Sequence, residues 1–131
     1  THASPKISYP GCGFVEEIGK DDGRGFNVPI PLDWRASEDD ILYVFEEIFN
    51  PIIFQFKPDI IAVCVGFDSY KEDPIGVLGV TETGFTSLGS VIENLGKSIE
   101  IPIAHFLEGG YNLSMLPTLL KSYIPAGKEP F

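Results

Sequence analysis

The chain has 131 residues, a formal net charge of −10 and 44% hydrophobic residues. This length is sufficient for one domain with a hydrophobic core, and the composition excludes a disordered or fibrous protein. The nine Lys and Arg residues are scattered, which argues against a nucleic-acid-binding surface. No apolar run approaches the roughly 20 residues that span a bilayer, so the sequence predicts a cytoplasmic protein that has no membrane segment.

The first quarter of the chain is predicted to be mostly irregular. Residues 4–25 are rich in Gly, Pro and charge, which is typical of loops. Residues 26–31 combine apolar residues with prolines, which favours a short edge strand. Ser37 then caps a predicted helix, whose acidic first turn suits a helix amino terminus. The apolar spacing carries this helix to about Lys57, with a bend or break at Pro51.

The remainder of the chain alternates strands and helices. Residues 60–65 are a continuous apolar run, typical of a parallel strand that is covered on both faces. A helix is expected from the cap residue Thr81 to about Lys97, followed by a second buried strand at residues 101–107. A last helix is expected to begin at the cap residue Ser114. This order predicts an α/β fold with a parallel sheet, helices on both faces and right-handed crossovers.

A carboxylate and a phenol follow the two strands of the predicted sheet. Asp68 comes after the first strand and Tyr111 after the second, and parallel sheets bind ligands at the carboxyl ends of their strands. We therefore expect Asp68 and Tyr111 to face one cleft. A carboxylate there can cap a turn, bind a metal or act as a base, and the local sequence leaves these roles open. Asp73-Pro74, by comparison, is typical of a turn.

Two glycines precede the tyrosine. Gly109 and Gly110 would let the backbone approach a ligand closely, and Tyr111 would then donate a hydrogen bond to a developing oxyanion. A simple glycine turn before a helix explains the same residues. The sequence pattern alone therefore leaves both interpretations open.

The remaining residues with reactive side chains are interpreted as structural. Cys12 and Cys64 match no metal-binding or redox spacing, and Cys64 is predicted to be a small buried thiol within its apolar run. His105 lies inside a predicted strand, where a core or sheet-face position is favoured over a ligand. The role of His2 is not indicated by its spacing.

Three motifs occur in order along the chain. They are Tyr9-Pro10-Gly11-Cys12-Gly13, Gly66-Phe67-Asp68 with Asp73-Pro74, and Glu108-Gly109-Gly110-Tyr111-Asn112-Leu113. Together they resemble the carboxyl-terminal third of the zinc-dependent histone deacetylase family, which includes acetoin-utilisation and acetylpolyamine deacetylases. The resemblance implies that residues 1–131 are the carboxyl-terminal portion of a single domain with an arginase/deacetylase-like α/β fold.

The resemblance also implies roles for individual residues. Enzymes of this family use zinc to remove acyl groups from amines such as acetyl-lysine or acetylpolyamines. Asp68 matches the third zinc ligand of the family, and Tyr111 matches the tyrosine that stabilises the oxyanion. Four further positions match residues that bind the substrate: Tyr9, Ile75, Gly109 and Gly110.

Part of the family's site has no counterpart in this sequence. The paired catalytic histidines and the Asp-x-His zinc motif correspond to positions upstream of Thr1, and a zinc site normally needs three protein ligands. Because the chain begins without Met, we interpret it as part of a longer protein. We expect the isolated chain to be catalytically silent and to need the amino-terminal portion or another chain. The alternative is a non-catalytic α/β module for binding or assembly.

Overall fold

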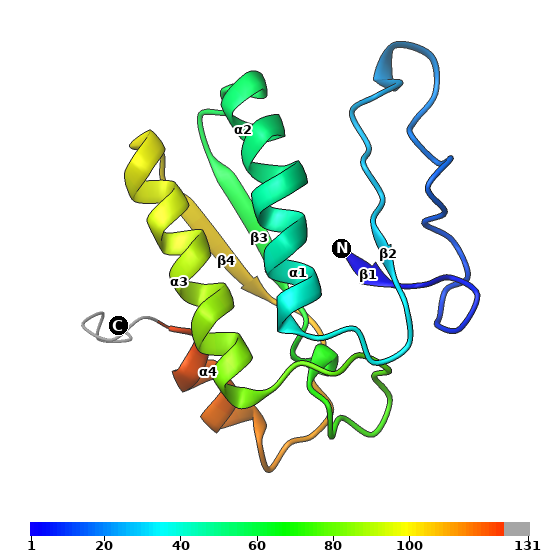
Figure 1. Ribbon diagram of the computed structural model, residues 1–131, viewed down its shortest axis with the longest axis vertical. Helices are drawn as coiled ribbons and strands as arrows, with labels where there is room; N and C mark the ends of the chain where they lie inside the picture. The colour runs from blue at the N-terminus through cyan, green and yellow to red at the C-terminus, as the bar shows by residue number, and fades with distance from the viewer. Residues whose placement is uncertain (125–131) are drawn as a thin grey trace.

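The computed structural model describes residues 1–124, and Figure 1 shows its arrangement. The strands form two separate two-stranded parallel sheets, β1 with β2 and β3 with β4. The elements in chain order are β1 (His2–Ala3), η1 (Asp21–Gly23), β2 (Pro31–Leu32), α1 (Glu38–Val44), the π-helical η2 (Phe45–Phe49), α2 (Asn50–Phe56), β3 (Ile61–Val65), η3 (Phe67–Ser69), α3 (Glu82–Ile99), β4 (Ile103–Leu107) and α4 (Leu116–Tyr123).

Helices α1 and α3 pack against each other and cover one face of β3 and β4 (Figure 1). Val63, Val65 and Ile103 contact the core from the strands, since alternate residues of a strand point to the same face. The predicted α/β class with parallel strands is confirmed. The buried residues of the core come from helices, strands and loops: Leu32, Ile41, Val44, Phe67, Tyr70, Val80, Phe85, Leu88, Ile92, Leu119 and Tyr123.

The opposite face of β3 and β4 is exposed within residues 1–124. Ala62 and Cys64 are exposed on β3, and Phe106 on β4 is 51% exposed. The expectation of strands covered on both faces therefore holds for one face only, and the prediction that Cys64 is buried is wrong. A continuous apolar run indicates that both faces suit burial, but it does not identify the segment that covers each face.

The cap residues of two helices are confirmed. The Asp40 carboxylate accepts a hydrogen bond of 2.8 Å from the Ser37 N–H at the start of α1, and Thr81 Oγ1 accepts one of 3.0 Å from Gly84 N–H at the start of α3. The predicted helix from Ser37 is divided by η2 immediately before the turn that contains Pro51. A proline has no N–H to donate one turn back, which explains the π-helical turn at this position, while the chain stays helical from Glu38 to Phe56.

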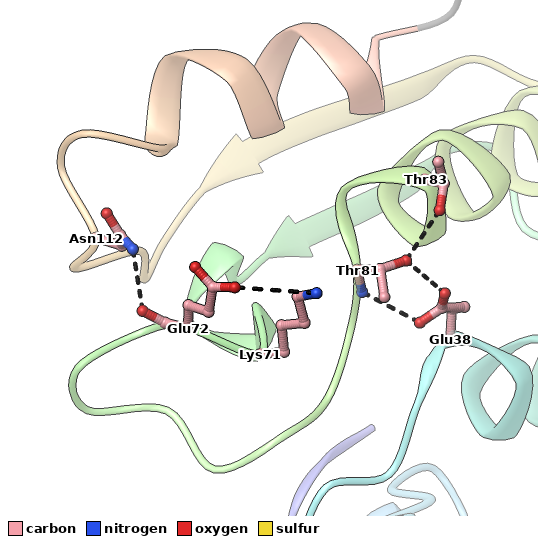
Figure 2. Close-up of polar contacts among 6 residues, drawn as sticks. All are labelled: Glu38, Lys71, Glu72, Thr81, Thr83 and Asn112. Atoms are coloured by element: carbon pink, nitrogen blue, oxygen red, sulfur yellow. Dashed lines mark hydrogen bonds and ion pairs between the residues drawn. The ribbon is translucent and has the colours of Figure 1, made fainter.

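A carboxylate from α1 also ties the starts of α1 and α3 together. Glu38 accepts hydrogen bonds from Thr81 N–H at 3.1 Å and from Thr81 Oγ1 at 2.5 Å, and Thr81 Oγ1 lies 3.0 Å from Thr83 Oγ1 (Figure 2). Burial acts to raise the pKa of Glu38, but the hydrogen bonds from Thr81 and from the Glu38 backbone, together with the positive charge of Lys71, outweigh it and leave the pKa lowered. The two helices are therefore held at the same end by one carboxylate.

The last helix begins later than predicted. Ser114 is not its cap, because the helix starts at Leu116 with Met115 in the cap position. Asn112 Oδ1 instead accepts hydrogen bonds from the Met115 N–H at 3.3 Å and from Ser114 Oγ at 2.7 Å. The sequence pattern therefore indicated a residue that can cap a helix, but the Ser114 hydroxyl is used in the turn before the helix.

The first quarter of the chain is irregular, as predicted, apart from short elements. The strand expected at residues 26–31 is wrong over most of its length, because only residues 31 and 32 form β2, which pairs in parallel with β1. Two prolines at positions 29 and 31 remove backbone donors, which limits pairing to a short segment. The sequence pattern gave no sign of β1.

The predicted position of His105 on the sheet is confirmed, since it lies in β4 and its Nδ1 is 2.8 Å from the Tyr123 hydroxyl. Within residues 1–124, no helix has both the length and the apolar character needed to cross a membrane. The cytoplasmic location stays a prediction.

Candidate functional site

Asp68 lies at the carboxyl end of β3, in the single turn η3. Its neighbour Phe67 is 1% exposed, stacks on Phe85 at 5.0 Å between ring centroids and meets Tyr123 edge-on at 5.9 Å. The burial of Phe67 fixes the backbone at the strand end. The adjacent Asp68 carboxylate is therefore held at the edge of the sheet where ligands of parallel sheets bind.

The half-buried Asp68 carboxylate lies against Gly109 of the second loop. A Cβ atom at Gly109 would come within 2.6 Å of Asp68 Cγ and 2.7 Å of both carboxylate oxygens, so only glycine fits here without displacing the carboxylate. Burial raises the pKa of Asp68, and the negative charge of Asp73 raises it further against the opposing effect of the Asp68 backbone N–H. A bound cation would offset the cost of burying this charge.

The loop that carries Tyr111 packs directly on the loop that carries Asp68. Phe67 N–H donates to the Gly109 carbonyl at 2.8 Å. Gly110 has a φ of +142°, and a Cβ there would approach Phe67 Cβ to 2.9 Å, so this position also requires glycine. Tyr111 follows with half of its surface exposed. The two loops predicted to meet at this edge of the sheet do meet.

Asp73 joins these two loops, although its sequence predicted only a turn. Its Oδ1 accepts hydrogen bonds from Ile75 N–H at 2.9 Å and Gly76 N–H at 2.8 Å, which fits the predicted turn. Its Oδ2 accepts from Tyr111 N–H at 2.8 Å and Asn112 N–H at 3.2 Å. No local sequence signal indicates these partners, which are 38 and 39 residues away.

The electrostatic environment keeps Asp73 ionised. Burial acts to raise the pKa of Asp73, but the four backbone N–H donors outweigh burial and hold the pKa below its usual value. A carboxylate that accepts several backbone hydrogen bonds is stabilised in its charged form. Asp73 therefore bridges the two loops as an anion near neutral pH.

The remaining predicted site residues are exposed. Tyr9, in the amino-terminal segment, is 96% exposed, and Ile75 is 66% exposed. Tyr9 and Asp68 both line a pocket of about 390 Å³ between that segment and the end of β3. Ile75 and Tyr111 do not line this pocket, but Asp73 connects them through their backbone N–H groups.

The described residues offer one side chain suited to a zinc ion at this edge. Asp68 suits the role of a single carboxylate ligand. Its side chain is half-buried, its pKa is raised, and Gly109 lies close beside its carboxylate. Residues 1–124 contain no group of three His, Cys, Asp or Glu side chains that would hold a metal. A zinc ion here therefore requires further ligands from beyond these residues.

Comparisons with known proteins agree with the three motifs. The Histone deacetylase domain, as a family model, matches residues 1–126. Histone deacetylase 14, chloroplastic, from Arabidopsis thaliana is 41% identical over 110 residues, which are 83% of this chain and 26% of that protein. Acetylpolyamine amidohydrolase from Burkholderia pseudomallei is 32% identical over 125 residues, which are 93% of this chain and 35% of that protein.

Solved structures give the same result for the fold. The crystal structure of acetylpolyamine aminohydrolase from Burkholderia pseudomallei matches with a TM-score of 0.82 and 31% sequence identity, over 93% of this chain and 34% of that chain. The HDA15 HD domain matches with a TM-score of 0.80 and 28% identity. The chain thus spans about a quarter to a third of the length of these relatives. Since the domain match extends over nearly all of its length, the chain belongs to the histone deacetylase family.

Proposed function

We propose that this chain is the carboxyl-terminal portion of a zinc-dependent deacylase that removes acetyl or other acyl groups from amines. The observation that carries the proposal is the juxtaposition at one sheet edge of the Asp68 carboxylate and the Gly109-Gly110-Tyr111 loop. Packing between these loops supports a joint role, because the glycines fit the space beside Asp68 and Phe67. Two relatives, a histone deacetylase and an acetylpolyamine amidohydrolase, support deacylation of amines as the reaction class.

Asp68 is proposed to be the metal ligand contributed by this chain. When bound, the zinc ion supplies a Lewis acid that polarises the acyl carbonyl and activates water. Asp68 holds one coordination position, and its partly buried carboxylate stays ionised when a cation compensates for its burial. The other ligands are assigned to another part of the protein or to another chain.

Tyr111 is proposed to act on the substrate directly. Its phenol O–H donates a hydrogen bond to the carbonyl oxygen as negative charge develops on that oxygen during attack on the amide. Such a donor acts best when its position is fixed before the reaction. The glycines before it let the loop pass close to Asp68, and we propose that the donor and the metal ligand act on the same carbonyl group.

The proposed substrate is an acylated amine, either acetyl-lysine or an acetylpolyamine. Ile75 and Tyr9 are large side chains with most of their surface exposed near this edge, as expected of residues that contact an extended alkyl chain. One relative is named as a histone deacetylase and another as an acetylpolyamine amidohydrolase. Both substrate classes are therefore proposed for this site, and the assay below compares them.

The proposed enzyme needs the rest of its domain. Phe106 on β4 and Ile60 before β3 are each more than half exposed, on the same face as the exposed Ala62 and Cys64. Contiguous apolar surface of this kind favours a covering partner. We propose that the amino-terminal portion of the deacetylase, or another chain, covers this surface and completes the site. The same surface also suits the alternative, a non-catalytic assembly module.

The experiment compares the isolated chain with the complete protein that supplies the remaining zinc ligands. Each is assayed with an acetyl-lysine peptide and an acetylpolyamine, with and without a zinc chelator. We expect zinc-dependent deacetylation by the complete protein only. Asp68→Asn is expected to lose bound zinc and activity together, and Tyr111→Phe is expected to keep zinc while kcat falls about 10²- to 10³-fold.

Tyr43→Phe is the matched control, because Tyr43 is an exposed tyrosine on α1, and it is expected to leave both zinc content and kcat unchanged. A complete protein that binds zinc equally well with asparagine at position 68, or that cleaves no acylated amine, would contradict the proposal. A metal-free complex with the partner chain would then favour the assembly module.

A further inference from the structure

We propose that Asp73 is a positioning residue that sets the place of Tyr111 relative to Ile75 through backbone hydrogen bonds. The proposal rests on the proposed function, because it assigns Tyr111 to the reaction and Ile75 to the substrate. It extends that function to a residue whose local sequence suggests only a turn.

The two oxygens of the Asp73 carboxylate divide their contacts between two loops. Oδ1 binds the N–H groups of Ile75 and Gly76 in its own loop, at 2.9 and 2.8 Å. Oδ2 binds the N–H groups of Tyr111 and Asn112 in the loop after β4, at 2.8 and 3.2 Å. The backbones of Ile75 and Tyr111 are therefore bound to opposite oxygens of one rigid, planar group.

Tyr111 needs such an anchor because neither the glycines before it nor packing of its side chain fixes its position. It follows two glycines, which leave a backbone with unusual conformational freedom, and half of its surface is exposed. The loop is fastened on one side by Phe67 N–H to the Gly109 carbonyl at 2.8 Å. On the other side, Asn112 Nδ2 donates to the Glu72 carbonyl at 3.0 Å (Figure 2). Asp73 acts between these two points, on the tyrosine's own N–H.

An amide cannot replace this carboxylate. An asparagine side chain at this position would retain one acceptor oxygen, and its NH₂ group would face two backbone N–H donors on the other side. Whichever way the amide is turned, one of the two loops loses its acceptor. Asp73→Asn therefore separates the loops with little change in side-chain volume.

The test uses the complete, zinc-loaded deacetylase and the variants Asp73→Asn, Tyr111→Phe and the double variant. Displacement of a reacting group by about 1 Å can cost about 100-fold in rate. We expect Asp73→Asn to lower kcat about 30- to 100-fold, with KM and zinc content within about threefold of the unsubstituted protein. In the Tyr111→Phe background, the same substitution should lower kcat less than about threefold, because Asp73 acts through the tyrosine.

Glu72→Gln is the matched control. Glu72 is the adjacent residue, its side chain is 64% exposed, and its carboxylate lies 3.9 Å from Lys71 Nζ (Figure 2). Only its backbone carbonyl takes part in joining the two loops, and this carbonyl is unchanged by the substitution. We expect kcat within about twofold of the unsubstituted protein, since exposed ion pairs contribute little.

Hydrogen exchange gives a readout that needs no variant and no activity. In the unsubstituted protein, we expect the amides of Tyr111 and Asn112 to exchange at least about tenfold more slowly than that of the exposed neighbour Leu113. Equal exchange at these amides would overturn the proposal. So would an active enzyme in which Asp73→Asn behaves like Glu72→Gln, or in which its effect multiplies fully with Tyr111→Phe. An unsubstituted enzyme without zinc-dependent deacetylation would instead refute the proposed function.

Discussion

The Tyr123 hydroxyl is expected to make stability depend on pH in the alkaline range. Tyr123 is 5% exposed, its hydroxyl lies 2.8 Å from His105 Nδ1, and its ring meets Phe67 edge-on. Burial raises the pKa of Tyr123 to about 12. Tyr123→Phe keeps the ring and its contact with Phe67, and removes only the ionisable hydroxyl.

The expected magnitude follows from that pKa. Loss of the hydrogen bond to His105 should cost about 1 kcal/mol of unfolding free energy at neutral pH. The folded protein also holds the Tyr123 proton more tightly than the unfolded chain, whose tyrosines have a pKa of about 10. The associated stabilisation, about 2–3 kcal/mol, is fully present below pH ~10 and is lost as the pH rises through ~12.

Urea unfolding, followed by circular dichroism at several pH values from about 7 to about 12, measures this effect. The free energy of unfolding of the unsubstituted chain should fall more steeply above pH ~10 than that of Tyr123→Phe, and the difference cancels the titration of all other groups. Tyr43→Phe, at an exposed position, should follow the unsubstituted chain. Parallel pH profiles for the unsubstituted chain and Tyr123→Phe would refute the reasoning.

Two further substitutions test how the site is built. Gly109→Ala places a Cβ 2.6 Å from Asp68 Cγ and should lower the zinc content and the kcat of the complete enzyme at least about tenfold. Gly23→Ala is the control, because its added Cβ meets nothing within 4 Å, and it should leave both quantities unchanged. Equal effects of the two variants would contradict the steric argument. Phe67→Ala should lower the unfolding free energy by about 3–5 kcal/mol, because Phe67 is 1% exposed. Phe26→Ala, at a position that is 74% exposed, should lower it by less than about 1 kcal/mol. Chemical denaturation of both variants measures this difference.

The sequence was sufficient to predict the elements that depend on local patterns. Helix starts at Ser37 and Thr81 depend on polar caps followed by spaced apolar residues, and both are present. The location of Asp68 and the Tyr111 loop at one sheet edge follows from two apolar runs that pair in parallel, because parallel strands end at the same edge.

Features that depend on distant partners were not predicted. Asp73 resembles any Asp that opens a turn before proline, and its bond to Tyr111 joins residues 38 positions apart. Cys64 lies in a strand that suits burial, but exposure depends on which segment covers that face. Ser114 has a side chain suited to a helix cap, but α4 begins at Leu116 with Met115 in the cap position, and the Ser114 hydroxyl instead donates to Asn112 Oδ1.

The segment between η3 and α3, residues 70–81, limits which sequence changes the protein tolerates. Its two ends are joined by Val80 N–H to the Ser69 carbonyl at 3.1 Å and by Lys71 N–H to the Val80 carbonyl at 2.9 Å. Glu38 fixes its end through Thr81. These bonds involve the backbone, so the number of residues is constrained more tightly than the exposed side chains. Substitution of the exposed Lys71 side chain should be tolerated, since its ion pair with Glu72 is exposed. Inserting or deleting one residue between Lys71 and Val80 would change the length of the span that these bonds close.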